Sequence, residues 1–313
     1  MDNIKKPAVE LHEPASSKSV SIIVPYYNTR GLLMANLPKV IEAKKVESNR
    51  ISEIIVVDDG SPVEKAAGLK EIFPSVKIIT HKINRGFSAA VNTGVRMAKG
   101  NLVALINTDV VPTKEFLKPA LEHFDDERVF AVSFKEKDYS WAKGDFKQGF
   151  LHHSPGPVTD GPHLSLWASG GSAVFRRKTW LTLGGMDEKL FSPFYWEDID
   201  LSYRAYKRGY KVIWEPAASV VHHHESTIST LNKSYTERIR QRNELLFIWK
   251  NITSQNLFRK HLSALFSRMA RHPGYARVVF SALLKLGSLV KARRKERKEA
   301  QISDEAIFSR FAT

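Results

Sequence analysis

The chain has 313 residues and contains no cysteine, which excludes disulfide bonds and thiolate metal sites. The absence also fits a reducing compartment. Residues 1–19 lack the apolar run of a secretory signal peptide. No stretch reaches the roughly 18 consecutive apolar residues that a membrane-spanning helix needs. We therefore expect a cytoplasmic protein.

Acidic side chains are scarce in residues 256–300, which hold two Asp or Glu against twelve Lys or Arg. This segment contributes a net charge of +10 to the +15 of the whole chain. Such a basic segment predicts a polyanionic partner, either an anionic membrane surface or a nucleic acid. No set of aromatic residues for base stacking accompanies the basic run, which disfavours nucleic acid.

The apolar residues of 278–290, in the same segment, are too few to span a bilayer and are interrupted by Lys285. We interpret this stretch as one interfacial helix, with its apolar face in lipid and its basic face toward the headgroups. The alternative is a packed helical hairpin with a solvated basic end. The sequence leaves both interpretations open.

Short apolar runs alternate with helical patterns in the first part of the chain. The runs that we expect to be strands are 19–28, 53–61, 76–82, 102–109 and 128–134. The stretches that we expect to be helices are 30–46, 62–73, 86–100 and 113–123. This alternation predicts an α/β fold, with a parallel sheet covered by helices on both faces.

The pattern is lost over residues 135–165, where we expect a long loop that is functional or mobile. The elements expected after it are a strand over 166–177, a helix over 196–209, an extended segment over 211–225 and an amphipathic helix over 237–252. We divide the chain into three parts, namely a flexible arm (1–18), a main domain (19–252) and a helical basic appendage (253–313).

Polar side chains follow several of the expected strands. They are Tyr27, Asp58, Asp59, Asn107 and Asp109. Because ligands of such sheets bind beyond the carboxyl ends of the strands, these residues mark a candidate site. The alternative, for any one cluster alone, is that Asp and Asn start turns and cap helices.

Asn107 and Asp109 lie two residues apart at a strand end, where positions i and i+2 face the same side. Carboxylate oxygen suits Mg²⁺ or Mn²⁺, and these ions share their ligation with substrate phosphates. A further candidate ligand lies in the run from His222 to Glu225, in which three adjacent histidines follow an apolar strand. The alternative for these histidines is a structural role.

Arg85 and Gly86 open an expected helix, and a helix N-terminus with an arginine suits a diphosphate. The chain matches neither the P-loop nor the glycine pattern of dinucleotide sites, which disfavours kinases, NTPases and dehydrogenases. Glu197, Asp198 and Asp200 begin another expected helix. One of these carboxylates can act as a general base; the alternative is that they stabilise the helix dipole.

Seven segments of the chain, in order, resemble the inverting glycosyltransferases of family 2, which have the GT-A fold. They are SIIVPYYN, EIIVVDDGS, NRGFSAAVNTG, LINTD, WASGGSAVFRR, FYWEDIDLSYRAYKRGY and VVHHHES, within residues 19–250. The sequence looks closest to the bacterial rhamnosyl- and galactofuranosyl-transferase-like branch, which builds cell-surface polysaccharides. The resemblance implies a mixed, mostly parallel sheet flanked by helices.

The resemblance also implies roles for residues at matching positions. The residues implied in nucleotide-sugar binding are Pro25, Tyr27, Asp59, Arg85, Asn107 and Asp109. Asp109 and His222 are the implied ligands of a divalent cation, Mg²⁺ or Mn²⁺, although Asn107 replaces the first Asp of the family's D-x-D motif. Asp198 is the implied catalytic base. The residues assigned to the acceptor side are Trp167, Gly170, Trp196 and Glu197; core packing is the alternative for the two tryptophans.

The resemblance therefore implies metal-assisted transfer of a sugar, with inversion, from a nucleotide-diphosphate sugar to an acceptor hydroxyl. We expect the acceptor to be a glycan or lipid-linked glycan in polysaccharide or glycolipid synthesis. We also expect the protein to lie peripherally on the inner face of the cell membrane, held by its basic tail. The alternative, which Asn107 favours, is a catalytically inactive scaffold that binds sugar nucleotides or membranes.

Overall fold

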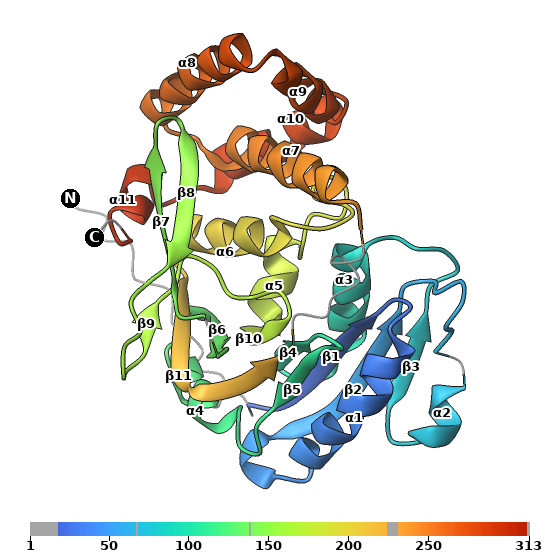
Figure 1. Cartoon of the computed structure of the whole chain (residues 1–313). Coiled ribbons are helices and arrows are strands. Elements are labelled where there is room, and N and C mark those ends of the chain that lie inside the picture. Colours follow the sequence, from blue (N-terminus) through green and yellow to red (C-terminus); the bar gives the residue numbers. More distant parts are fainter. Residues whose placement is uncertain (1–17, 67, 138, 224–230, 312–313) are drawn as a thin grey trace, which may run out of the picture.

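A computed structural model describes residues 18–66, 68–137, 139–223 and 231–311. These residues form a nine-stranded mixed sheet with the strand order β3-β2-β1-β4-β10-β6-β11-β5, and β9 pairs with β11 (Figure 1). The strands are Val20–Tyr26 (β1), Ile51–Asp58 (β2), Lys77–Thr80 (β3), Leu102–Ile106 (β4), Val110–Pro112 (β5), Val129–Lys135 (β6), His163–Leu164 (β9), Ser172–Arg176 (β10) and Lys211–His222 (β11).

The direction of β10 brings a second group of residues to the edge where the parallel strands end. Strands β1 to β4 pair in parallel, whereas β10 runs antiparallel between β4 and β6. Ser172, the first residue of β10, therefore lies opposite Ile106, the last residue of β4. The turn that precedes β10 is placed beside the polar residues that follow β4.

Helices cover both faces of the sheet. One face packs against Arg30–Lys44 (α1), Leu69–Ile72 (α2) and Lys118–Glu122 (α4). The other face packs against Phe87–Met97 (α3), Arg177–Leu183 (α5) and Glu197–Lys207 (α6). Neighbouring strand residues such as Ile22 and Ile23 belong to the two different cores, because successive side chains point to opposite faces. A mixed, mostly parallel sheet between helices is thereby confirmed.

Some of the expected elements are shorter in the structure. The helix expected over 62–73 is limited to Leu69–Ile72. The strand expected over 166–177 is shorter and is followed directly by α5, which buries Trp180 and Leu183 and ends at Gly184 in the left-handed conformation. The apolar positions of α5 lie three residues apart, which is a helical spacing.

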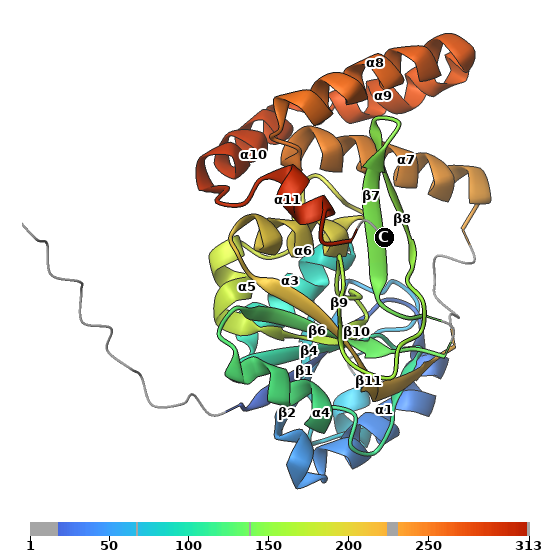
Figure 2. The ribbon, with the colours of Figure 1, turned by 90° about the vertical axis from the view of Figure 1, so that its left-hand side faces the viewer.

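The prediction of a loop over residues 135–165 is wrong for most of that range. Ala142–Lys147 (β7) and Phe150–Pro155 (β8) form an antiparallel hairpin. Gln148 and Gly149 form its two-residue turn, and both have positive φ, as tight hairpin turns require. Figure 2 shows the hairpin reaching the C-terminal helices, and the carbonyl of Gly149 accepts a hydrogen bond from His261. The charged side chains along β7 hide its alternating pattern of burial.

The C-terminal part is helical, as expected, and stacks beyond α6 in Figure 1. Its helices are Lys233–Asn251 (α7), Gln255–Arg271 (α8), Ala276–Leu283 (α9), Leu286–Glu299 (α10) and Asp304–Phe308 (α11). The single helix expected over 278–290 is wrong, because the chain turns at Leu284–Lys285 and both pieces pack on α7. No helix in the described part of the chain is long and apolar enough to cross a membrane.

The buried carboxylate of Asp304 links α11, near the C-terminal end of the chain, to α6 and to the connection between α7 and α8. Asp304, at the start of α11, accepts hydrogen bonds from Lys207 Nζ at 2.7 Å and from the Tyr203 hydroxyl at 2.6 Å, both on α6. It also accepts from the backbone N–H groups of Thr253 and Ser254, at 2.7 and 2.6 Å, between α7 and α8. Burial, together with the Asp304 carboxylate, raises the pKa of Tyr203 well above its usual value.

We predict that Asp304→Ala lowers the free energy of unfolding by about 3–5 kcal/mol, because it leaves the Lys207 ammonium buried without its counter-ion. Urea unfolding of the full-length chain measures this change. Glu305→Ala, at the neighbouring exposed position, is the matched control and should have a much smaller effect. Equal losses in the two variants would contradict this account of the C-terminal attachment.

Candidate active site

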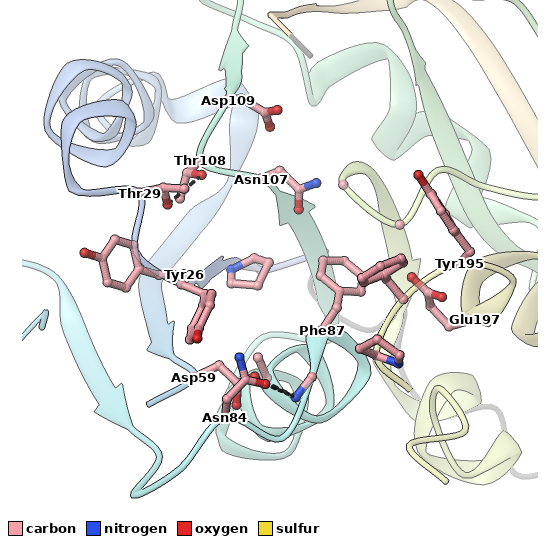
Figure 3. A pocket seen from close by; sticks show the side chains of 18 of the residues that line it. Tyr26, Thr29, Asp59, Asn84, Phe87, Asn107, Thr108, Asp109, Tyr195 and Glu197 are labelled. Carbon is pink, nitrogen blue, oxygen red and sulfur yellow. Dashed lines mark hydrogen bonds between the residues drawn. The ribbon is translucent and has the colours of Figure 1, made fainter. Parts of the chain in front are cut away.

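A cavity of about 510 Å³ lies at the edge of the sheet where the parallel strands end. Its volume is within the range of roughly 300–1,000 Å³ that is usual for small-molecule sites. The lining comes from the ends of β1, β2 and β4, from the starts of α3 and α6, and from the turn before β10. Figure 3 shows Asp59 and Asn84 on one side, Tyr195 and Glu197 on the opposite side, and Asn107 between them.

Asp59 lines this cavity and holds the start of α3. Its carboxylate accepts hydrogen bonds from the backbone N–H groups of Arg85, at 3.0 and 3.1 Å, and of Gly86, at 2.7 Å. His81 Nδ1 lies 2.6 Å from the same carboxylate. A negative charge at this place stabilises the positive end of the helix dipole. Asp59 therefore shapes the loop before α3, and its contact with a nucleotide base stays a prediction.

Asn107, at the end of β4, places a buried oxygen at the cavity. Its side-chain Oδ1 has no hydrogen-bond partner among the described residues. Its backbone N–H donates to the carbonyl of Gly171 at 3.0 Å, which fixes the turn before β10 against this residue. Because a buried polar atom without a partner is costly, Asn107 Oδ1 is suited to accept a hydrogen bond from a ligand.

Asp109 and His222 face each other across the junction of β5 and β11. His222 Nε2 lies 3.3 Å from Asp109 Oδ1, and His222 Nδ1 lies 2.9 Å from Glu136 Oε2. The Ser172 hydroxyl donates to the other oxygen of Glu136. Burial by itself would lower the pKa of His222, but its contacts with Asp109 and Glu136 raise it to about 9. Glu136 thus fixes the orientation of the imidazole that faces Asp109.

The pair of Asp109 and His222 fits a divalent cation only in part. The described residues include no group of three or more His, Cys, Asp or Glu side chains arranged to hold a metal ion. Mg²⁺ and Mn²⁺, however, often take one or two protein ligands and complete their coordination with substrate phosphates and water. Oxygen from Asp109 and nitrogen from His222 fit an ion of that kind, with Glu136 as the carboxylate behind the histidine.

The neighbouring histidines of the same run are placed differently. His223 is exposed, and its backbone N–H donates to the carbonyl of Asp109 at 3.0 Å. His224 and Glu225 lie outside the described residues. Among the described histidines of the run, His222 is therefore the one whose ring faces Asp109.

Glu197 and Asp198 begin α6 and line the cavity on the side opposite Asp59. Asp198 accepts hydrogen bonds from its neighbour Ile199 at 2.8 Å and from the backbone N–H of Gly170 at 3.3 Å. Burial raises the pKa of Asp198, while these backbone hydrogen bonds oppose the rise. Burial, together with the charge of Asp198, raises the pKa of Glu197 well above its usual value. Burial thus favours the neutral form of both carboxyl groups, and the charge of Asp198 adds to this effect at Glu197.

Four of the candidate residues lie outside the cavity lining. One of them is His222, which contacts the lining residue Asp109. The Arg85 guanidinium pairs with Glu188 at 3.0 Å, so Arg85 meets the site only through its backbone. Trp196 is 5% exposed and packs against Phe247, with ring centroids 5.2 Å apart. Trp167 is half-buried in the same neighbourhood. The other candidates do line the cavity, and they are Pro25, Tyr27, Asp59, Asn107, Asp109, Gly170, Glu197 and Asp198.

Sequence reasoning missed an aromatic wall of the cavity and the residue behind His222. Phe194, Tyr195 and Tyr235 line the cavity near Glu197, and the Phe194 ring lies 5.0 Å from that of Tyr195 and 6.4 Å from that of Tyr235. Phe194 and Tyr195 directly precede the acidic cluster, so their place in the sequence could have revealed them. Glu136 carried no such signal, because it meets His222 only through the pairing of β6 with β11.

Comparisons with known proteins identify the family. Residues 21–179 match the family described as Glycosyl transferase family 2, and residues 102–292 match the one described as Glycosyl transferase family group 2. The chain belongs to glycosyl transferase family 2. A Pre-mycofactocin glycosyltransferase of Mycobacterium tuberculosis is 29% identical over 225 residues, which are 68% of this chain and 44% of that protein. The chain thus spans less than half the length of this relative.

Solved structures with the GT-A fold are similar to this chain. GalNAc-T7 with UDP, GalNAc and Mn²⁺ has a TM-score of 0.60 at 15% identity, covering 82% of this chain and 56% of that one. The mannosyltransferase PcManGT from Pyrobaculum calidifontis, in complex with GDP-Man and Mn²⁺, has a TM-score of 0.54 at 19% identity, covering 92% and 91%. At these identities the likeness establishes the GT-A fold.

We predict that Gly171→Ala weakens nucleotide binding by about tenfold or more. The loss is that expected when the Asn107 amide no longer makes a hydrogen bond with the ligand. An added Cβ would lie 2.2 Å from Asn107 Nδ2 and would displace the amide. Gly170→Ala is the matched control, since its Cβ would meet no atom closer than 3.4 Å. Titration calorimetry with UDP, GDP and dTDP in Mn²⁺ measures both variants. Equal affinities in the two would contradict a ligand contact by Asn107.

Proposed function

We propose that the chain is a glycosyltransferase that moves a sugar from a nucleotide-diphosphate-sugar donor to an acceptor hydroxyl, with inversion at the anomeric carbon. The observation that carries this proposal is the cavity that Asp59, Asn107 and Asp198 line together. Membership of the family and the likeness to two enzymes whose structures contain UDP or GDP-Man support the nature of the donor.

In the proposed reaction, Asp198 takes the proton of the acceptor hydroxyl. The acceptor oxygen forms a bond with the anomeric carbon, from the side opposite the leaving group. The bond between that carbon and the diphosphate oxygen breaks, and the nucleoside diphosphate leaves with the electron pair. The raised pKa of Asp198 makes it a stronger base than a solvent-exposed carboxylate. Glu197, whose neutral form is favoured by burial, lines the cavity beside Asp198.

Asp109 and His222 are the residues that would hold a divalent cation, Mg²⁺ or Mn²⁺. Such an ion, when bound, supplies positive charge beside the diphosphate as it leaves. The two protein ligands come from β11 and from the segment between β4 and β5. Asn107, where the family's motif has Asp, contributes a neutral oxygen to this side of the cavity. The Mn²⁺ in the two similar structures supports this assignment.

The acceptor side of the proposed reaction is the wall formed by Gly170, Glu197, Phe194, Tyr195 and Tyr235. Partly exposed aromatic rings offer flat apolar surfaces on which sugar rings can stack. A glycan or lipid-linked glycan is the acceptor we propose, in polysaccharide or glycolipid synthesis. The motif resemblance supports the rhamnosyl- and galactofuranosyl-transferase-like branch as part of the proposal.

Asp198→Asn should lower kcat by about 10²–10⁴-fold and leave nucleotide binding intact, because the amide keeps the shape of the side chain but accepts no proton. Release of nucleoside diphosphate from UDP-glucose, GDP-mannose and dTDP-rhamnose measures turnover, and calorimetry measures binding. Glu197→Gln is the matched control, since it makes the same change from carboxyl to amide at the neighbouring position, and we expect a far smaller loss. Turnover by Asp198→Asn close to that of the unchanged chain would refute the assignment.

We also propose that the C-terminal helices bind an anionic membrane surface. Large apolar side chains are exposed on α8 to α10, and they are Leu262, Phe266, Phe280, Leu283, Leu284, Leu286 and Val290. Residues 256–300 around them have a net charge of +10. Exposed apolar side chains among basic ones complement a bilayer of anionic lipids. A lipid surface bound by these helices would suit a lipid-linked acceptor and a peripheral position on the inner face of the membrane.

Flotation with phosphatidylglycerol vesicles checks the lipid proposal. The chain should float with the vesicles at low salt and less so at high salt, since each Lys or Arg near an anionic surface contributes about 1 kcal/mol. Replacing Phe266, Phe280 and Leu284 by Ser should abolish flotation. The control replaces Val63 and Val158, which are equally exposed elsewhere, by Ser. Failure of the unchanged chain to float at low salt, or equal flotation of both variants, would exclude this surface as the binding site.

A further inference from the structure

The segment that leads into α6 holds a strained backbone. Tyr195 and Trp196 are consecutive and have φ of 73° and 76°, in the left-handed region that bulky side chains rarely adopt. The next two residues are Glu197 and Asp198, which line the cavity. A strained conformation persists only where the surrounding structure holds it. The orientation of Asp198 therefore depends on whatever fixes the segment from 191 to 196.

The side chain of Asn243, on α7, contacts this segment at three carbonyls. It is fully buried, and its Nδ2 group donates to the carbonyls of Phe191 at 3.1 Å, Phe194 at 2.9 Å and Tyr195 at 2.9 Å. These carbonyls belong to no helix or strand, so the side chain supplies the hydrogen bonds that a regular element would otherwise provide. One amide group thus fixes both ends of the segment.

Two neighbours of Asn243 on α7 complete this arrangement. The Arg242 guanidinium donates to the Ser192 carbonyl at 2.7 Å and to Asn243 Oδ1 at 2.9 and 3.0 Å. The second contact fixes the orientation of the Asn243 amide, so that its nitrogen faces the segment. Phe247, one helical turn further on, packs against the Trp196 ring. Successive turns of α7 therefore hold the backbone and the side chain of the strained pair.

We infer that Asn243 is a positioning residue, which sets the place of Asp198 and of the aromatic wall by holding the strained backbone of Tyr195 and Trp196. The inference rests on the proposed role of Asp198 as the base. Asn243 does not line the cavity, so it acts on the reaction only through the segment it holds. A displacement of about 1 Å in a reacting group can reduce the rate by about 100-fold.

Amide hydrogen exchange of the full-length chain tests the structural half of this inference without any substrate. In Asn243→Ala, exchange in a peptide covering 191–200 should become at least about tenfold faster, because the opened state of this segment is favoured. Asn49→Ala is the matched control. Asn49 is equally buried, but its amide donates to the carbonyls of Ala43 at 2.9 Å and Lys114 at 2.8 Å, outside the measured peptide. Unchanged exchange in Asn243→Ala, or the same change in both variants, would overturn the inference.

Measurements of turnover test whether Asn243 affects the reaction through Asp198. With the donors used for Asp198→Asn, Asn243→Ala should lower kcat by about 10- to 100-fold and leave KM for the donor nearly unchanged. Asn49→Ala should keep its kcat at temperatures where it is folded. In the Asp198→Asn background, Asn243→Ala should add little, since both changes act on the same group. Losses that multiply in the double variant would overturn the positioning role.

The two proposals fail in distinguishable ways. If Asp198→Asn turns over normally, the base assignment is wrong, whatever Asn243→Ala does to hydrogen exchange. If Asp198→Asn is impaired but Asn243→Ala turns over normally, the base assignment stands and the positioning role is wrong.

Discussion

The fully buried carboxylate of Asp200 joins the two helices on which the candidate site depends. It accepts hydrogen bonds from Arg204 at 2.8 Å, from Lys250 at 2.9 Å and from Asn251 at 2.8 Å. A buried charge is costly unless its partners are all in place, so this cluster fixes the position of α7 along α6. With that position set, α7 carries Asn243 to the segment before Asp198, and α9 and α10 pack on its outer side.

The two sides of the cavity are built by different kinds of interaction. On the Asp59 side, the carboxylate of Asp59 at the end of β2 holds the loop between β3 and α3 by hydrogen bonds from backbone N–H groups. On the Asp198 side, the backbone is strained and is held by side chains of a helix that follows about 50 residues later. We expect the Asp59 side of the cavity to be rigid, because it is held by elements of the central sheet. The Asp198 side should depend on how the C-terminal helices pack.

Much of the sheet could be predicted from the sequence, because β1, β2 and β4 are continuous apolar runs that end at polar residues. The cavity residues at those strand ends were predicted for the same reason. The hairpin of β7 and β8 could not be recognised from hydrophobic periodicity, since its exposed positions are charged and its turn depends on positive φ at Gln148 and Gly149. The roles of Glu136 and Asn243 could not be predicted from the sequence either, because their contacts join segments far apart in the sequence.

We propose that Asp109 and His222 bind a divalent cation together with the diphosphate of a sugar nucleotide. The most direct test is titration calorimetry of UDP, GDP and dTDP, each with Mn²⁺ and with EDTA. We predict that one nucleotide binds in Mn²⁺, that EDTA abolishes this binding, and that Asp109→Ala and His222→Ala each lose it. Binding of equal strength in EDTA, or no binding of any nucleotide in Mn²⁺, would contradict the account.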